Sequence, residues 1–404
     1  MQTVTLRDES KRQGDFYVPR YEIKIAGANL PQNVVRDVLQ VAYSDNVTEL
    51  GGFEFTVSNW DAEKREFKYV GSETTDSLAK NPLHQLFNPS RHEVELYLGY
   101  GGKLSLMIKG DLTTVEPSFP SSGGPTLNVR GVNVLNKLRT KQFDIPTWTD
   151  EKPSRIAKSF EDLRDPSDPG KKRFPLEVEI DDNAVQKEEK IKYLAQHNQY
   201  DIDFLLALAR RVGYVIFIKE EEREKGRVTK PRRLYFGPSD ANHPGLRLVT
   251  FELRWGISLI DFKPTFTTAN QIKTVTLNGW NRSTKQPITG TASLDSAKFK
   301  LNRDLHRQLE TPDARAEQVV DEPVFTQRQA DDRAAAILLE RSKNLVTASG
   351  TCVGLPDLRA GQRVKIAGLG ARFSGEYFVT ETTHTINDSG YTTKFSVRRE
   401  DPGK

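Results

Sequence analysis

The stretch "GLGARFSGEYFVTETTHTINDSGYTTKFSVRR" spans residues 368–399. Residues Tyr377 to Ile386 are rich in aromatic and β-branched side chains, which is typical of a strand whose even and odd positions point to opposite faces. "NDSG" then supplies turn-forming residues, and Tyr391 to Val397 are expected to form the returning strand. The stretch therefore predicts a β-hairpin. His384 is expected to share a face with Phe378, Thr380, Thr382 and Ile386, while Asp388 and Ser389 lie in the turn, which favours a structural role for this histidine over a catalytic one.

The same two-residue period recurs near the start of the chain. It is found at 21–25, 53–57, 94–98 and 104–108. "GYGGK" (99–103) separates the last two runs and fits a hairpin turn, because glycine tolerates positive φ. We therefore expect an N-terminal arm at 1–20 and a first β-barrel domain at 21–130.

Helical spacing dominates the next part of the chain, 131–240. The clearest helix is expected at 201–212, with Asp201 as its N-cap and Gly213 as its C-terminal stop. "EEKIKYLAQH" (188–197) also shows helical spacing, whereas "YVIFI" (214–218) is typical of a buried strand. This part is expected to be an α+β domain.

Strands resume in the remainder, 241–404, around one helix expected at 326–344 with a capping box formed by Thr326 and Gln329. This remainder is expected to be a second β-barrel domain. The predicted fold class is β-rich α+β, with two β-barrel, tube-like domains and an intervening α+β segment.

Composition narrows the function classes. Lys and Arg total 59 against 55 Asp and Glu, so the formal net charge of +4 is too dilute for nucleic-acid specificity. A single cysteine, Cys352, allows neither an intrachain disulfide nor a cysteine zinc cage. The polar start and the lack of an apolar run of ~18 residues predict synthesis in the cytoplasm without membrane insertion.

No catalytic constellation stands out from the sequence. The six histidines lack metal-ligand spacing, and Cys352 sits in a strand-like apolar run. Two acidic pairs, Asp181–Asp182 and Asp331–Asp332, leave a cell-wall hydrolase as an alternative, since such enzymes place two carboxylates about one bond. "GLGARFSG" lacks the Gly-Lys-Ser/Thr of a phosphate loop, and no helix is expected after it. We predict no catalytic, cofactor or metal site.

Three segments, in this order, carry a resemblance to a known family. They are "LAQHNQYDIDFLLALARRVGYVIFI" (194–218), "ISLIDFKPTFTTANQIKTVTLNGWNRSTKQPITGTAS" (257–293) and "GLPDLRAGQRVKIAGLGARFSGEYFVTETTHTINDSGYTTKF" (354–395). Together they resemble the phage late control protein D family. Its members are hub proteins of contractile phage tails and the related spike hubs of type VI secretion and extracellular contractile injection systems.

The resemblance implies a non-enzymatic structural role. Family members form a homotrimer in which each chain gives two similar barrels, so that six surround the axis and join the inner tube to the spike. Expected partners are other copies of the chain, the tube protein, other baseplate proteins and a separately encoded spike with an oligosaccharide-binding fold and a β-helix. Six residues are expected to form the turns and barrel closure: Gly368, Gly370, Gly375, Tyr377, Gly390 and Tyr391. A hydrolase of the same particle, or a binding module for sugar or nucleic acid, are the alternatives.

Overall fold

The computed structural model describes most of the chain. The described residues are 2–5, 8, 18–74, 76, 81–89, 93–101, 103–139, 146–165, 168–172, 174, 176–224, 227–239, 249–267, 272–281, 284–294, 315–320 and 324–399.

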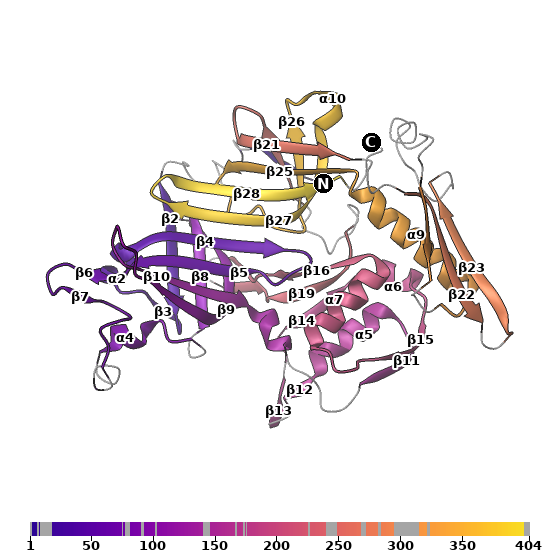
Figure 1. Cartoon of the computed structure of the whole chain (residues 1–404), viewed down its shortest axis with the longest axis horizontal. Helices are drawn as coiled ribbons and strands as arrows, with labels where there is room; N and C mark the ends of the chain where they lie inside the picture. Colours follow the sequence, from indigo (N-terminus) through magenta and orange to yellow (C-terminus); the bar gives the residue numbers. More distant parts are fainter. Residues whose placement is uncertain are drawn as a thin grey trace.

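Residues 18–133, here called the first β region, form antiparallel strands in the order β3-β2-β8-β9-β10-β5-β4 (Figure 1). The strands are β2 (Pro19–Ile25), β3 (Ala28–Asn29), β4 (Val38–Asn46), β5 (Gly52–Ser58), β8 (Glu93–Tyr100), β9 (Lys103–Ser118) and β10 (Thr126–Asn133). The expected alternation is confirmed in β5, where Phe53, Phe55 and Val57 are buried. Tyr100 pairs with Lys103, as a hairpin at "GYGGK" requires.

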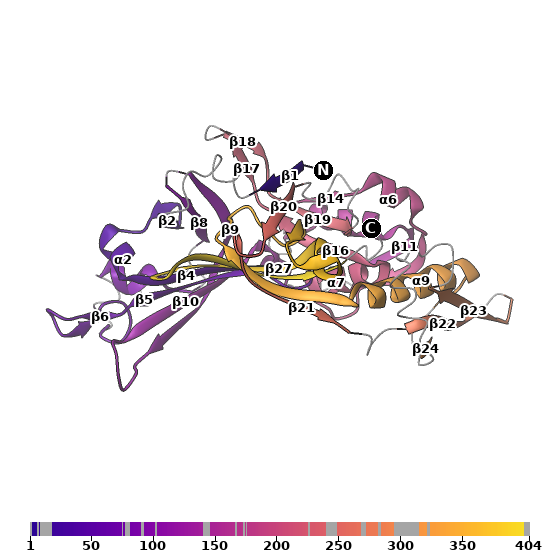
Figure 2. The ribbon, with the colours of Figure 1, turned by 90° about the horizontal axis from the view of Figure 1, so that it is seen from above.

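Shorter elements decorate this region. They are α2 (Gln32–Asp37), α4 (Pro82–Leu86) and the small hairpin of β6 (Trp60–Asp61) and β7 (Glu66–Phe67). Figure 2 shows β6 at one end of an elongated molecule.

Residues 249–399, the second β region, supply strands to the same sheet. These are β20 (Val249–Arg254), β21 (Leu259–Phe266), β25 (Val346–Val353), β26 (Arg363–Ala367), β27 (Gly375–Asn387) and β28 (Gly390–Arg398), and β1 (Gln2–Thr5) pairs in parallel with β20. The hairpin predicted from 368–399 is confirmed as β27 and β28, with Asn387 opposite Gly390.

Strand β27 joins the two β regions. Its residues Gly375–Phe378 pair with β26, and the following Glu381–Ile386 pair with β4 of the first β region. A register irregularity between Val379 and Glu381 separates the two portions. A bulge bends a strand and increases its local twist, so one strand can pass from one sheet neighbour to the next.

Each β region has its own apolar core. The core of the first includes Phe55, Leu96 and Val129, together with Ile386 and Tyr391 from the tip of the β27–β28 hairpin. The core of the second includes Tyr377 and Val379 from the other end of the same hairpin. The hairpin therefore ties the two cores together.

Residues 134–239 form a middle module with a third core. A sheet of β14 (Glu177–Ile180), β19 (Arg233–Pro238) and β16 (Tyr214–Lys219) packs against helices. The helices and remaining strands are η1 (Val134–Leu138), α5 (Pro153–Ser159), η2 (Phe160–Asp162), α6 (Asp182–Lys187), α7 (Asp201–Val212), β11 (Thr147–Glu151), β12 (Arg164–Asp165), β13 (Asp168–Lys172), β15 (Ile191–Ala195), β17 (Glu222–Glu224) and β18 (Arg227–Lys230).

Two expectations for the middle module are wrong in detail. Part of "EEKIKYLAQH" is strand β15, which pairs antiparallel with β11, so tertiary pairing overrides the helical spacing of a short segment. The N-cap of α7 is Tyr200 and not Asp201, which is the first helical residue and accepts a hydrogen bond from Gln196. The stop at Gly213, with φ of +72°, is confirmed.

A further layer lies at the other end of the molecule from β6 (Figure 2). It comprises β22 (Ile272–Asn281), β23 (Gln286–Ser293) and β24 (Arg315–Val319), with α9 (Gln327–Lys343) packed on the sheet. Thr326 caps α9, its hydroxyl accepting from the Gln329 backbone N–H at 3.1 Å. The β-rich α+β class is thus confirmed, while the boundaries of the four expected segments stay a prediction. Among the described residues, no helix has the length and apolarity needed to cross a membrane.

Candidate functional site

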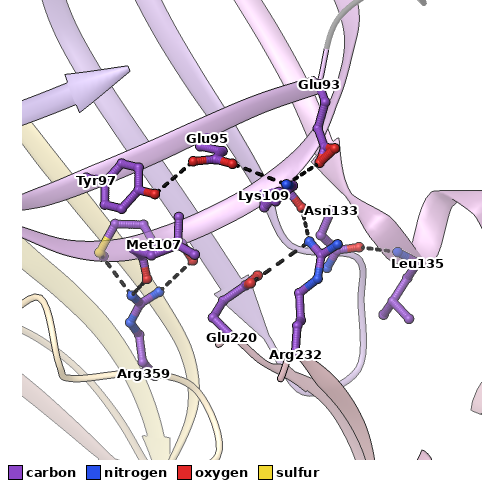
Figure 3. Close-up of polar contacts among 11 residues, drawn as sticks. Glu93, Glu95, Tyr97, Met107, Lys109, Asn133, Leu135, Glu220, Arg232 and Arg359 are labelled. Atoms are coloured by element: carbon purple, nitrogen blue, oxygen red, sulfur yellow. Dashed lines mark hydrogen bonds and ion pairs between the residues drawn. The ribbon is translucent and has the colours of Figure 1, made fainter. Parts of the chain in front are cut away.

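The two β regions meet at a junction formed by loop 354–362, the β8–β9 hairpin and the β27–β28 hairpin. Its centre is Arg359, which is 7% exposed. Its Nε donates to the Pro356 carbonyl at 2.8 Å, while Nη1 and Nη2 donate to the carbonyls of Met107 and Leu106 at 3.0 and 2.9 Å. Figure 3 shows the guanidinium reaching β9 across the junction. One charged side chain thereby ties the second β region to the first.

A bulge in β9 provides hydrogen-bond acceptors for this arginine. Leu96 pairs with Ile108 and the next residue, Tyr97, pairs with Leu106, so Met107 is the additional residue. An extra residue leaves the ladder locally disrupted, and its carbonyl is available to another donor. The Met107 sulfur lies 3.0 Å from Nη2 of Arg359, and the Tyr43 ring lies 4.8 Å from its guanidinium carbon. Charge-assisted hydrogen bonds and a π face together stabilise the buried cation.

His384 completes the junction from β27, and it is fully buried. Its Nε2 lies 2.9 Å from the Leu358 carbonyl, which can only accept, so Nε2 carries the proton. Its Nδ1 is then the acceptor, and the hydroxyls of Tyr391 and Thr393 lie 3.0 and 3.1 Å from its one lone-pair nitrogen. Burial lowers the pKa of His384 well below its usual range, and the charge of Arg359 lowers it further. The imidazole is neutral and fixed in one tautomer, which fits a structural role.

Tyr391 packs over the start of loop 354–362. A Cβ added to Gly354 would lie 2.1 Å from the Tyr391 ring, so only glycine fits there. The Gly354 N–H donates to the Tyr391 carbonyl, and the Gly354 carbonyl accepts from the Tyr100 hydroxyl at 3.0 Å. Burial raises the pKa of Tyr391 well above its usual range.

The middle module joins the first β region through a second polar cluster (Figure 3). Lys109 of β9 pairs with Glu93 at 3.0 Å and Glu95 at 3.2 Å, and its carbonyl accepts from Arg232 at 2.6 Å. Arg232 also lies 4.0 Å from Glu220, next to the β17–β18 arm. Strand β9 is therefore held by two arginines, Arg359 and Arg232, from two different parts of the chain.

The six residues expected at turns and barrel closure fall into two groups. Near α10 (Gly370–Phe373), Gly368, Gly370 and Gly375 have φ of +88°, +69° and +141°, and the Tyr377 hydroxyl donates to the Phe373 carbonyl. At the other end of the hairpin Gly390 has φ of +115° and Tyr391 lies in the junction. The short helix α10 lies within "GLGARFSG", and strand β27 follows the motif, so the expectation that no helix follows it is confirmed. The structure does not bring these six residues together into one site.

Cys352, Asp181 and Asp331, which were weighed as catalytic candidates, are buried or engaged in local hydrogen bonds. Cys352 is fully buried, and burial raises the pKa of its thiol. Asp181 caps α6 by accepting from the Asn183 N–H, and Asp331 accepts from Gln327 at 3.1 Å. Within the described residues, no group of three His, Cys, Asp or Glu side chains could hold a metal ion.

Sequence reasoning missed Arg359 and Arg232. Their acceptors on β9 lie 252 and 123 residues away in the chain. No local spacing carries that information.

A family model matches most of the chain. The family model described as the Alg8 N-terminal domain matches residues 17–388. The chain belongs to this family. No curated protein matches the chain in sequence.

Solved structures show the fold that this family member shares. A 43 kDa tail protein of prophage MuSo2 from Shewanella oneidensis is 15% identical, with a TM-score of 0.62 over 96% of this chain and 100% of that one. A tail protein from Neisseria meningitidis MC58 is 12% identical, with a TM-score of 0.62 over 95% and 97%.

A component of the E. coli type VI secretion system, itself similar in structure to the T4 bacteriophage tail proteins gp27 and gp5, is 11% identical. Its TM-score is 0.53 over 93% of this chain and 76% of that one. The fold is thus that of tail proteins, which confirms at this level the resemblance to the hub family.

Proposed function

We propose that the chain is a structural baseplate hub, a non-enzymatic adaptor that as a homotrimer joins the inner tube to the spike of a contractile tail or injection system. The observation that carries this proposal is the sharing of strand β27 between the two β regions. Three chains with two barrels each can make a ring of six only if the two barrels of one chain keep a fixed relation.

The junction supports such a fixed relation. A charged side chain with less than a tenth of its surface exposed, a fully buried histidine and a shared strand connect the two cores. Buried polar contacts of this kind specify one geometry, because any displacement leaves donors and acceptors unsatisfied. A part that transmits force during contraction needs that property.

Partners and location follow as part of the same proposal. The tube protein would contact one face of the ring and the spike the other, and the protein would be a component of the assembled particle. The hydrolase alternative has less support, because Asp181 and Asp331 are engaged in local hydrogen bonds of α6 and α9.

Class averages of the purified protein by negative-stain electron microscopy test the proposal. We expect rings with threefold symmetry and six lobes of similar size. Associated particles with twofold symmetry would contradict it, as would release of soluble fragments from peptidoglycan by the purified protein.

A further inference from the structure

A cleft of about 1050 Å³ separates the middle module from α9. Helices α6 and α7 form one side, and α9 forms the other (Figure 1). Small-molecule pockets are commonly about 300–1,000 Å³. The cleft is therefore large enough for several side chains of a partner.

Few interactions close this cleft. Arg328 of α9 pairs with Glu189 at 2.7 Å, and Nη1 of Arg333 donates to the carbonyls of Arg210 and Arg211 at 3.3 and 2.7 Å. These contacts hold the two sides in register and leave the space between them open.

The wall combines an apolar part with excess positive charge. Ala207, Val212, Tyr214 and Ala336 contribute apolar surface. Six cationic side chains line the cleft against four anionic ones. The anionic ones are engaged: for example, Glu188 accepts from the Ser154 N–H, and Glu189 pairs with Arg328. Lys187 and Lys190 are exposed and have no side-chain partner among the residues that the structure describes. The unbalanced charge is thus positive.

The backbone around the cleft favours a peptide over a phosphate. Helix α7 turns its C-terminal end, the negative end of its dipole, towards the cleft, so its last carbonyls accept hydrogen bonds there. Phosphate and carboxylate are both repelled by that end, but a peptide also offers backbone N–H donors that these carbonyls can accept, whereas an ionised phosphate offers none.

We propose that this cleft binds an acidic segment of a partner protein, with apolar side chains between its carboxylates. Lys187 and Lys190 would meet the carboxylates, and the apolar wall would take the intervening side chains. The inference depends on the proposed hub function in one respect. If the chain is a hub, the partner is another protein of the same particle.

The test uses a fluorescein-labelled (Glu-Leu)₄ peptide and fluorescence anisotropy with the full chain. We expect saturable binding that weakens as salt rises, and a loss of at least about tenfold in affinity in Lys187→Glu/Lys190→Glu, since each factor of ten is about 1.4 kcal/mol. The matched control is Lys103→Glu/Lys394→Glu, which makes the same charge change at exposed sites outside the cleft. It should bind like the wild type.

A second measurement locates the peptide. Because Cys352 is fully buried, Ala207→Cys gives one accessible thiol for an environment-sensitive dye. We expect its emission to change with the same midpoint as the anisotropy. Equal binding of (Gln-Leu)₄ or (Lys-Leu)₄, equal losses in the two double variants, or binding without an emission change would each overturn the proposal.

Light scattering of the double variants separates this inference from the hub proposal. If Lys187→Glu/Lys190→Glu keeps the wild-type mass and no longer binds the peptide, the loss of binding is due to the change in the cleft and not to a change in assembly. A failure to bind (Glu-Leu)₄ in a protein that still forms the expected ring would overturn the cleft alone.

Discussion

Arg359 carries a positive charge into the junction, where Pro356, Leu106 and Met107 provide its acceptors. Arg359→Met keeps a long apolar stem but removes the N–H donors to these carbonyls. Because hydrogen bonds to charged groups contribute about 1.5–3 kcal/mol each, we expect the free energy of unfolding to fall by about 3 kcal/mol or more. Urea denaturation followed by fluorescence measures this change.

The matched control for Arg359 is Arg341→Met, which removes an exposed arginine whose Nη2 lies 3.5 Å from Glu317. An exposed ion pair contributes about 0–1 kcal/mol, so this variant should remain close to the wild type. Equal losses in the two variants would show that Arg359 has no special role in the junction.

His384 gives the junction a defined pH dependence. Its pKa is lowered in the folded protein, whereas in the unfolded chain it is about 6.5. The unfolded state therefore takes up the proton first as pH falls. The stability that His384 contributes is complete above about pH 6.5 and is lost below it, at up to about 1.4 kcal/mol per pH unit.

Melting temperatures at pH 8 and pH 5.5 test this pH dependence against His384→Gln, which also donates and accepts hydrogen bonds but does not titrate. We expect the wild type to lose more stability than the variant between the two pH values. The same loss in both proteins would mean that other groups cause it.

The sequence predicted the place of His384 but not its partners. Alternation along β27 puts Thr382, His384 and Ile386 on one buried face, as observed. Arg359 gave no such signal, because its acceptors belong to a bulge whose extra residue, Met107, departs from the strand period. Local period can assign a face, whereas a long-range contact depends on the folded topology.

At the level of elements, β27 depends on the turn that precedes it. Gly375 has φ of +141°, and an added Cβ would lie 3.1 Å from Nη2 of Arg399. Gly375→Val should therefore lower the melting temperature or block assembly, with a cost of about 1–3 kcal/mol for the backbone strain alone. Scanning calorimetry and the mass in solution report the two effects.

Gly390→Val is the control for Gly375→Val, because it introduces the backbone strain of a positive φ without a steric contact to a neighbouring side chain. Gly390 has φ of +115°, but nothing lies within 4 Å of its added Cβ. We expect it to be less damaging than Gly375→Val. A Gly375→Val protein that assembles normally and melts at the wild-type temperature would refute the role given to this turn.

Elements differ in how well their sequences reveal them. β5 and the β27–β28 hairpin were predicted because each buries one face over several residues. β15 was missed because its residues pair with β11, forty or more positions earlier, and their local spacing resembles a helix. The N-cap of α7 was predicted one residue too late. Asp201 is the first helical residue, and its carboxylate accepts a hydrogen bond from Gln196.

At the scale of the whole molecule, the pairing of β4 with β27 makes one sheet from two β regions that are far apart in sequence. The fold class could be predicted from strand period and helix spacing. The joining of the regions could not, because Val41 and Ile386 meet only once the intervening chain has folded. Rigid coupling of the two cores is what a hub with two barrels per chain requires.

The most direct measurement of the hub proposal is the mass of the purified protein by light scattering, alone and with candidate tube and spike proteins. One chain has a mass of 45.7 kDa. We expect a trimer, three times that mass, which binds both partners. A protein that stays monomeric with both partners present would contradict the proposal.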